Sequence, residues 1–199
     1  MDALEAIFAR RSVGRLTDPA PAGDDLRTIL EAGAAAPDHG ELRPWRFVLL
    51  AGEAKVAFGG VLAHAYLARA TAGGVEPHPA KEEKERTKLG RAPLVVVVAA
   101  VRRPDETIPW DEQRLAAGAA AQNMLLAATA LGYGSMWRTG DPAYDPLVKS
   151  ALGLRDEDAV IGFLYLGTPH EGRGTEARTA ERGRPGLDGL VEEWAPPAR

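Results

Sequence analysis

Eight consecutive apolar residues, Leu94 to Val101, constrain the fold more than any other stretch of the sequence. The run is rich in valine and shows no alternation of apolar and polar side chains, which is typical of a β-strand covered on both faces. It is too short to cross a bilayer as a helix, which needs about 20 apolar residues. The run therefore predicts a sheet buried between two layers.

Apolar periodicity places further helices and strands on both sides of this run. We expect helices over residues 2–11, 24–35, 54–70 and 111–131, a short helix that begins at Asp145-Pro146, and strands over residues 46–51, 135–138 and 160–166. The longest helix is rich in alanine and apolar nearly all round, as in helices that are central and buried. The alternation of strands and helices by itself favours a parallel α/β sheet.

Composition narrows the classes of function. At 199 residues, with 45% hydrophobic and 26% charged, the chain suits one globular domain. A formal net charge of -4 disfavours a general nucleic-acid surface. With 0 cysteines, thiolate metal sites and cysteine nucleophiles are excluded, and the 4 histidines lack paired ligand spacing, so we expect no metal. The first residues lack the apolar core of a signal peptide, and we expect a cytoplasmic protein.

Several familiar nucleotide-binding and catalytic motifs are absent from the sequence. There is no Gly-x-Gly-x-x-Gly after a strand, no Gly-Lys-Ser/Thr phosphate loop and no Gly-x-Ser-x-Gly nucleophile elbow. If the chain is an enzyme, its reactivity therefore comes from a bound organic cofactor. The run Lys81–Arg86 carries charges of both signs, and we interpret it as an exposed, solvated helix or a mobile excursion.

Three polar segments could bind a ligand, and each also has a structural explanation. Arg10, Arg11 and Ser12 lie at the end of the first predicted helix; they could clamp a phosphate, or the arginines could complement the helix dipole. The loop over residues 36–45 holds His39 and could address a planar ligand or form an ordinary turn. Residues 132–140 offer glycines, an aromatic ring and a cation, or else a helix cap and a core side chain.

The composition changes after Gly167. Residues 170–186 are rich in Gly, Arg, Glu and Thr and have no apolar period. Apolar side chains then return at helical spacing, at Leu187, Leu190, Val191 and Trp194. We therefore expect one domain over residues 1–169 and an arm over residues 170–199, which ends in a short amphipathic helix and packs on a partner subunit.

Taken together and in this order, several short motifs resemble the flavin-dependent nitroreductase family, in its YdjA-like branch of NAD(P)H nitroreductases. The motifs are Arg10-Arg11-Ser12, Ala36–His39 with Pro44-Trp45, Arg91–Leu94, Trp110–Gln113, Trp137-Arg138 and Gly162–Pro169. The resemblance covers about residues 1–169. The tail resembles that branch poorly, and its Arg182-Gly183-Arg184-Pro185 is more similar to the basic ending of other nitroreductases.

The resemblance implies an FMN site at a homodimer interface, to which both subunits contribute. Arg10, Arg11 and Ser12 match the motif that holds the FMN phosphate and ribityl chain, and His39 would reach the flavin bound mainly by the other subunit. The other positions that match flavin contacts are Ala35, Trp137, Arg138, Thr139 and the tail residues Arg184 and Arg182. The stretch assigned to nicotinamide-nucleotide contact is Ala127, Ala128, Thr129, Ala130, Leu131 and Gly132, although packing of an apolar helix explains it equally well.

The implied fold is α+β: a central mixed, mostly antiparallel sheet flanked by helices, with a C-terminal arm exchanged in the homodimer. We prefer it to the parallel sheet, because periodicity does not fix strand direction. The implied activity is that of an FMN-dependent oxidoreductase. It passes hydride from NAD(P)H through the flavin to an electron-poor acceptor, such as a nitroaromatic or quinone, by a ping-pong mechanism. The alternative is a flavin-binding protein without turnover, used in storage or sensing.

Overall fold

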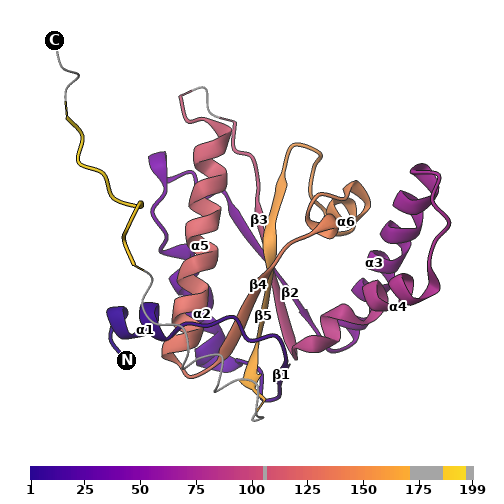
Figure 1. Cartoon of the computed structure of the whole chain (residues 1–199), viewed down its shortest axis with the longest axis horizontal. Helices are drawn as coiled ribbons and strands as arrows, with labels where there is room; N and C mark the ends of the chain where they lie inside the picture. Colours follow the sequence, from indigo (N-terminus) through magenta and orange to yellow (C-terminus); the bar gives the residue numbers. More distant parts are fainter. Residues whose placement is uncertain (105–106, 171–185, 196–199) are drawn as a thin grey trace.

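The computed structural model describes residues 1–104, 107–170 and 186–195, which form a sheet between two groups of helices (Figure 1). The helices are α1 (Ala3–Ala9), α2 (Gly23–Ala34), α3 (Gly52–Ala72), α4 (Pro79–Thr87), α5 (Trp110–Ala130) and α6 (Pro146–Ala151). The strands are β1 (Leu16–Thr17), β2 (Trp45–Ala51), β3 (Leu94–Ala100), β4 (Gly134–Arg138) and β5 (Ala159–Pro169). The helices and strands predicted within residues 2–166 are all present, and β1 is additional.

Strand direction is where the local pattern misleads. The strands follow the order β1-β5-β3-β2, with β4 also on β5, and every pair of named strands is antiparallel. The parallel α/β sheet favoured by the alternation of elements is therefore wrong, and the mostly antiparallel sheet implied by the resemblance is confirmed. Burial periodicity reports which faces are covered, and it is the same for a covered strand in either direction.

The apolar run at 94–101 forms the strand that the sequence predicts. All residues of β3 are at most 4% exposed, because the strand pairs on both edges and is covered on both faces. Its side chains alternate between two cores. Val96 and Val98 pack beneath α2 and α5, whereas Val95 and Val97 face α3 and α6.

Two helix starts follow directly from capping chemistry. Asp2 and Glu5 form a capping box on α1, in which each side chain accepts a 2.8 Å hydrogen bond from the other residue's backbone N–H. Asp145 caps α6 and accepts from the backbone N–H groups of Leu147 and Val148, as the Asp145-Pro146 pair predicts. No helix in the described ranges combines the length and apolarity that a membrane crossing needs.

The short amphipathic helix predicted over residues 187–194 is wrong. The described tail, residues 186–195, contains a turn but no helix, and Gly189 has a φ of 72°, outside the helical region. Its apolar side chains, Leu187, Leu190, Val191 and Trp194, are 68–83% exposed. A helix this short is marginal in water unless its apolar face packs against something.

Candidate functional site

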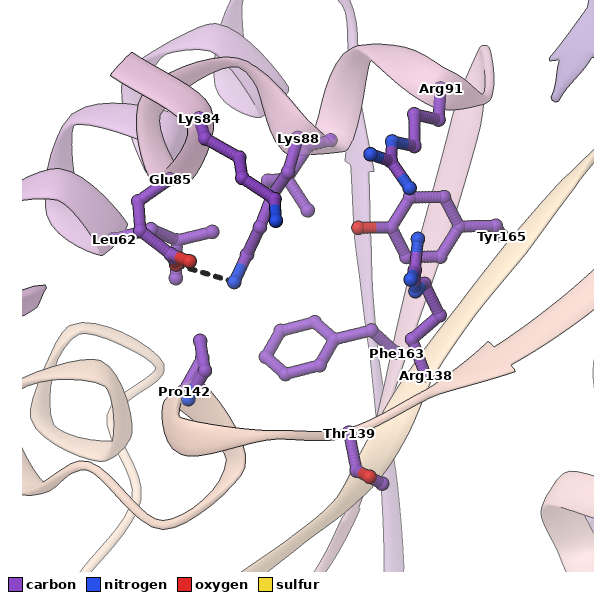
Figure 2. Close-up of a pocket in the computed structure, with 11 residues that line it drawn as sticks. Leu62, Lys84, Glu85, Lys88, Arg91, Arg138, Thr139, Pro142, Phe163 and Tyr165 are labelled. Carbon is purple, nitrogen blue, oxygen red and sulfur yellow. Dashed lines mark hydrogen bonds and ion pairs between the residues drawn. The ribbon is translucent and has the colours of Figure 1, made fainter. Parts of the chain in front are cut away.

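A pocket of about 130 Å³ opens over β5 on the side of the sheet that α3 and α4 cover (Figure 2). Its lining combines apolar side chains with a group of cations, and side chains from α3, α4, β4 and β5 converge on it. The residues around it are Leu62, Lys84, Glu85, Lys88, Leu89, Arg91, Arg138, Thr139, Pro142, Phe163 and Tyr165.

The pairing of β4 with β5 determines which of their side chains line the pocket. Arg138 pairs with Phe163, and Phe163 and Tyr165 share one face of β5 because strand side chains alternate. Trp137 packs with the core beneath α2 and α5, and its Nε1 donates to the Ile161 carbonyl at 3.1 Å. The close approach of this indole requires a glycine at position 162, where a Cβ would lie 2.1 Å from Nε1. Trp137 therefore has a packing role and faces away from the pocket.

The pocket carries an excess of positive charge. Lys88 forms an ion pair with Glu85, the acidic residue among the lining side chains. Lys84, Arg91 and Arg138 have no ion pair with any described carboxylate. These cations surround the same hollow as the apolar wall of Leu62 and Phe163 (Figure 2). Such an arrangement suits a flat ligand that carries or develops negative charge.

The Tyr165 hydroxyl lines this pocket although the residue as a whole is only 4% exposed. The Arg138 guanidinium lies 6.0 Å from the centre of its ring. Burial raises the pKa of the Tyr165 phenol, and the nearby charges of Arg138 and Arg91 offset only part of that rise. Tyr165 is therefore a neutral hydrogen-bond donor at physiological pH.

Arg10, Arg11 and Ser12 lie along the free edge of β4. Ser12 forms a parallel bridge with Ser135, and the Val13 N–H donates to the Ser135 carbonyl at 2.9 Å. Since Ser135 and Arg138 are three residues apart on one strand, the residue that Ser12 pairs with lies about 10 Å along β4 from Arg138. The structure thus brings the predicted phosphate motif and the predicted Arg138-Thr139 segment to one strand.

The two arginines of the motif differ in their surroundings. The Arg11 guanidinium donates to the carbonyls of Phe8 and Arg10 at 2.5 and 2.9 Å, so it holds the backbone that follows α1. The Arg10 side chain is half-buried and forms no hydrogen bond or ion pair with a described residue. Arg10 is therefore the arginine that is available to a ligand.

Ala35 and His39 lie on the other side of the sheet. Ala35 is the exposed C-cap of α2, and His39 begins the turn His39–Glu41. The His39 Nδ1 is 2.8 Å from Oε2 of Glu112 on α5, and the His39 side chain is 66% exposed. Within one chain, therefore, the sheet separates His39 from the pocket, and its contact with a flavin stays a prediction.

The stretch Ala127–Gly132 forms the last turn and cap of α5. Ala128 is fully buried, and the Thr129 hydroxyl donates to the Leu125 carbonyl at 2.9 Å, so packing and a local hydrogen bond account for both. Ala127 and Ala130 border a shallow hollow against α1, away from the cationic pocket. Nicotinamide contact here stays a prediction. Arg182 and Arg184 lie outside the described residues.

The sequence interpretation missed most of the pocket cations. We interpreted the run Lys81–Arg86 as solvated, yet its Lys84 turns toward one hollow together with Lys88 and Arg91, which follow the run. Their spacing of four and three residues is the sign that could have revealed them, because it aligns them on one side of a helix. Phe163 and Tyr165, two residues apart in a predicted strand, likewise share a face.

Comparison with known proteins agrees with this fold. The sequence profile described as "Nitroreductase family" matches residues 7–168, and the chain belongs to that family. It is 42% identical over 169 residues to "Putative NAD(P)H nitroreductase YdjA" of Escherichia coli (strain K12), a match that covers 85% of this chain and 89% of that protein. The resemblance found in the sequence motifs is thereby confirmed.

Solved structures give the same result. A nitroreductase with bound FMN from Bacteroides fragilis superposes with a TM-score of 0.71 and 26% identity, covering 98% of this chain and all of the other. A nitroreductase-like family protein from Bacillus cereus gives a TM-score of 0.73 and 25% identity, covering 98% and 96% of the two chains.

Proposed function

We propose that this chain is an FMN-dependent oxidoreductase that takes hydride from NAD(P)H and passes electrons to an electron-poor small molecule, such as a nitroaromatic or a quinone. The observation that carries the proposal is the cationic pocket, which shares strand β4 with the Arg10–Ser12 motif. Membership in the nitroreductase family and the FMN-bound relative support the choice of cofactor.

The residues present fit the chemistry of FMN. The mononucleotide has a phosphate dianion at one end, which suits the free guanidinium of Arg10 and the exposed Ser12. The ring at its other end suits the apolar wall of Leu62 and Phe163. Arg138 and Lys84 then supply positive potential beside the ring.

When bound, the flavin supplies hydride acceptance and the onward transfer of electrons. The chain's own side chains bind and orient: Arg10 and Ser12 anchor one end, and the wall over β5 sets the plane of the other. Positive charge at Arg138 and Lys84 would stabilise a bound group that gains negative charge in this pocket. These groups are in place before reaction, so they need no reorganisation.

We infer a homodimer in which the arm of one subunit packs on the other. A site for a small molecule commonly encloses about 300–1,000 Å³, whereas the cationic pocket of one chain encloses about 130 Å³. The apolar face of α1 (Leu4, Ile7, Phe8) and the apolar tail are exposed, and such surfaces mark association sites. A second copy would cover them and could supply His39 of the partner subunit to the open side of the pocket.

The kinetic scheme that we propose is ping-pong. The described residues form one pocket suited to a flavin, and they contain no separate dinucleotide-binding motif. NAD(P)H and the acceptor would then visit the same site in turn. Reciprocal plots at several fixed acceptor concentrations should be parallel. Lines that intersect would show that both substrates bind together and would reject the scheme.

Purified protein tests the cofactor directly. Heat should release a flavin whose mass is that of FMN, and NADPH added without air should bleach the bound flavin. Release of FAD, or failure to bind flavin after reconstitution, would refute the proposal. A flavin that stays oxidised in the presence of both NADH and NADPH would instead identify a storage or sensing protein.

A further inference from the structure

Tyr165 differs from the other buried or half-buried tyrosines in having no hydrogen-bond partner among the described residues. The Tyr133 hydroxyl donates to Asp25 at 2.7 Å, and the Tyr66 hydroxyl accepts from the His78 N–H at 3.0 Å. The Tyr165 hydroxyl instead points into the pocket (Figure 2). It is not among the fully buried, unpartnered polar atoms of the described residues, which are Arg11 Nε, Arg46 Nε and Ser135 Oγ, so it is open to the pocket and to a ligand that enters it.

Packing alone does not explain a tyrosine at position 165. Two residues earlier on the same face of β5, Phe163 lines the same pocket with a ring and no hydroxyl. A phenylalanine would fill the position of the Tyr165 ring equally well, but it would present no hydrogen-bond donor to the pocket. The hydroxyl is therefore the feature that needs an explanation.

The surroundings of the Tyr165 hydroxyl indicate what it would bind. Arg91 and Arg138 flank the ring, and Lys84 reaches toward the same space (Figure 2). The acidic lining residue, Glu85, is already paired with Lys88. A neutral donor between uncompensated cations recognises an acceptor atom that carries negative charge, and it binds that acceptor more tightly as the charge increases.

We propose that Tyr165 is a cofactor-contacting residue whose hydroxyl donates a hydrogen bond to an acceptor atom on the flavin and thereby favours the reduced cofactor over the oxidised one. This proposal rests on the proposed function, because it places the flavin ring in this pocket. It assigns to a named side chain part of the control of the reduction potential. Arg91 and Arg138 provide the positive field in which that hydrogen bond acts.

The test replaces the hydroxyl and keeps the ring. Apo-protein with Tyr165→Phe is titrated with oxidised FMN by flavin fluorescence, and the midpoint potential of the bound flavin is measured by anaerobic equilibration with a reference dye. We expect the affinity for oxidised FMN to change by less than about threefold. The affinity for reduced FMN should fall about tenfold more, which makes the two-electron midpoint potential about 30 mV more negative.

The control is Tyr133→Phe, which removes a tyrosine hydroxyl on the opposite side of the sheet and should leave the potential unchanged. An unchanged potential in Tyr165→Phe, or an equal loss of affinity for both redox forms, would overturn the proposal. If wild-type protein binds no FMN, the proposed function itself fails. Binding and reduction of FMN by wild type, with no effect of Tyr165→Phe, refutes only the role of Tyr165.

A measurement on wild-type protein guards against a variant that does not fold. Tyrosine ionisation is followed by ultraviolet absorbance in alkaline solution, with and without FMN. A hydroxyl that donates to the flavin ionises at a higher pH in the loaded protein than in the apo-protein. Identical ionisation curves for the two forms would also overturn the proposal.

Discussion

The two faces of the sheet are built from the same strands but are closed in different ways. On the side of α2 and α5, Leu164 and Leu166 are fully buried against the alanines and Met124 of α5. On the side of α3 and α4, the alternate residues Phe163 and Tyr165 form the floor of a charged pocket. One strand therefore supplies a dry core with every second residue and a ligand site with the residues between.

The closely packed face, beneath α2 and α5, holds the strands in place for the pocket on the opposite face. A backbone fixed by close packing on one side cannot shift to accommodate a ligand on the other, so the pocket residues keep their positions before anything binds. Mutations on the two faces should consequently affect different properties of the protein. Changes on the dry face should lower the stability of the fold, and changes on the pocket face should lower the affinity for FMN.

The largest effect is expected from a cavity on the dry face. Leu164→Ala removes a fully buried side chain at the centre of β5 and should lower the free energy of unfolding by about 2–5 kcal/mol. Val56→Ala, at a position on α3 that is 73% exposed, is the control and should change it by less than about 0.5 kcal/mol. Urea denaturation of both variants measures the difference. A loss below about 1 kcal/mol for Leu164→Ala would show that the dry face readily repacks.

Arg10→Ala should have the converse effect. The charge-assisted pair between Arg10 and the FMN phosphate is expected to contribute about 1.5–3 kcal/mol, so its loss should weaken FMN binding roughly tenfold to a hundredfold. Stability should hardly change, because Arg10 has no hydrogen bond or ion pair with a described residue.

Fluorescence titration of apo-protein measures this loss of affinity, with Arg27→Ala as the matched control. Arg27 is an exposed arginine on α2 that pairs with Glu31, on the other side of the sheet. Equal FMN affinity of Arg10→Ala and wild type would show that Arg10 does not bind the phosphate and only complements the dipole at the end of α1.

The elements themselves could be predicted from the sequence because their causes are local. The valine run predicts β3, Asp145-Pro146 predicts the start of α6, and the alanine-rich helix is α5. Strand direction could not be predicted, since it depends on how the connecting helices cross the sheet. The pocket face of residues 81–91 was also missed, because a charge run on an exposed helix and one that borders a ligand site have the same local pattern.

The predicted site was recovered only in part from the motifs. Ser12, Arg138 and Thr139 do lie on or beside β4, as the resemblance implies. Trp137 packs in the core beneath α2 and α5, on a face of β4 that the sequence could not show, and its contact with a flavin stays a prediction. The helix predicted in the tail is absent. Its apolar side chains pack against nothing in the described part of this chain, and a short helix without such packing is not stable.

Asp158 lies in the loop before β5, and its substitution should lower the stability of the fold but leave the affinity for FMN unchanged. Burial raises the pKa of this carboxyl. Hydrogen bonds from the backbone N–H groups of Arg155 and Arg102, together with the Arg155 guanidinium, lower it by more than burial raises it, so the net pKa lies below the ordinary 3.8. The carboxylate thus stabilises the fold above that pH, and the stabilisation disappears as the pH falls through the lowered value.

Asp158→Asn should therefore lower the free energy of unfolding by about 1–3 kcal/mol at neutral pH, and the difference from wild type should shrink in acid. Denaturation at a series of pH values measures it, and FMN affinity should stay within about twofold because Asp158 is not among the residues that line the pocket. A difference that grows as the pH falls would contradict this assignment.

The smallest effect distinguishes a pocket cation from a solvated one on the same helix. Lys84 and Lys81 both lie on α4, are both exposed, and belong to the same charged run, but of the two only Lys84 lines the pocket. Lys84→Gln should weaken FMN binding about two- to tenfold, through the loss of roughly 0.5–1.4 kcal/mol of attraction in a solvent-accessible site. Lys81→Gln should leave it unchanged. A long-range effect of charge would act at both positions. If such an effect explains the contribution of Lys84, the FMN affinities of the two variants should become equal as the ionic strength rises. Equal affinities of the two variants at low salt would show that α4 contributes only general charge, and that the pocket face begins at Arg91 and Arg138.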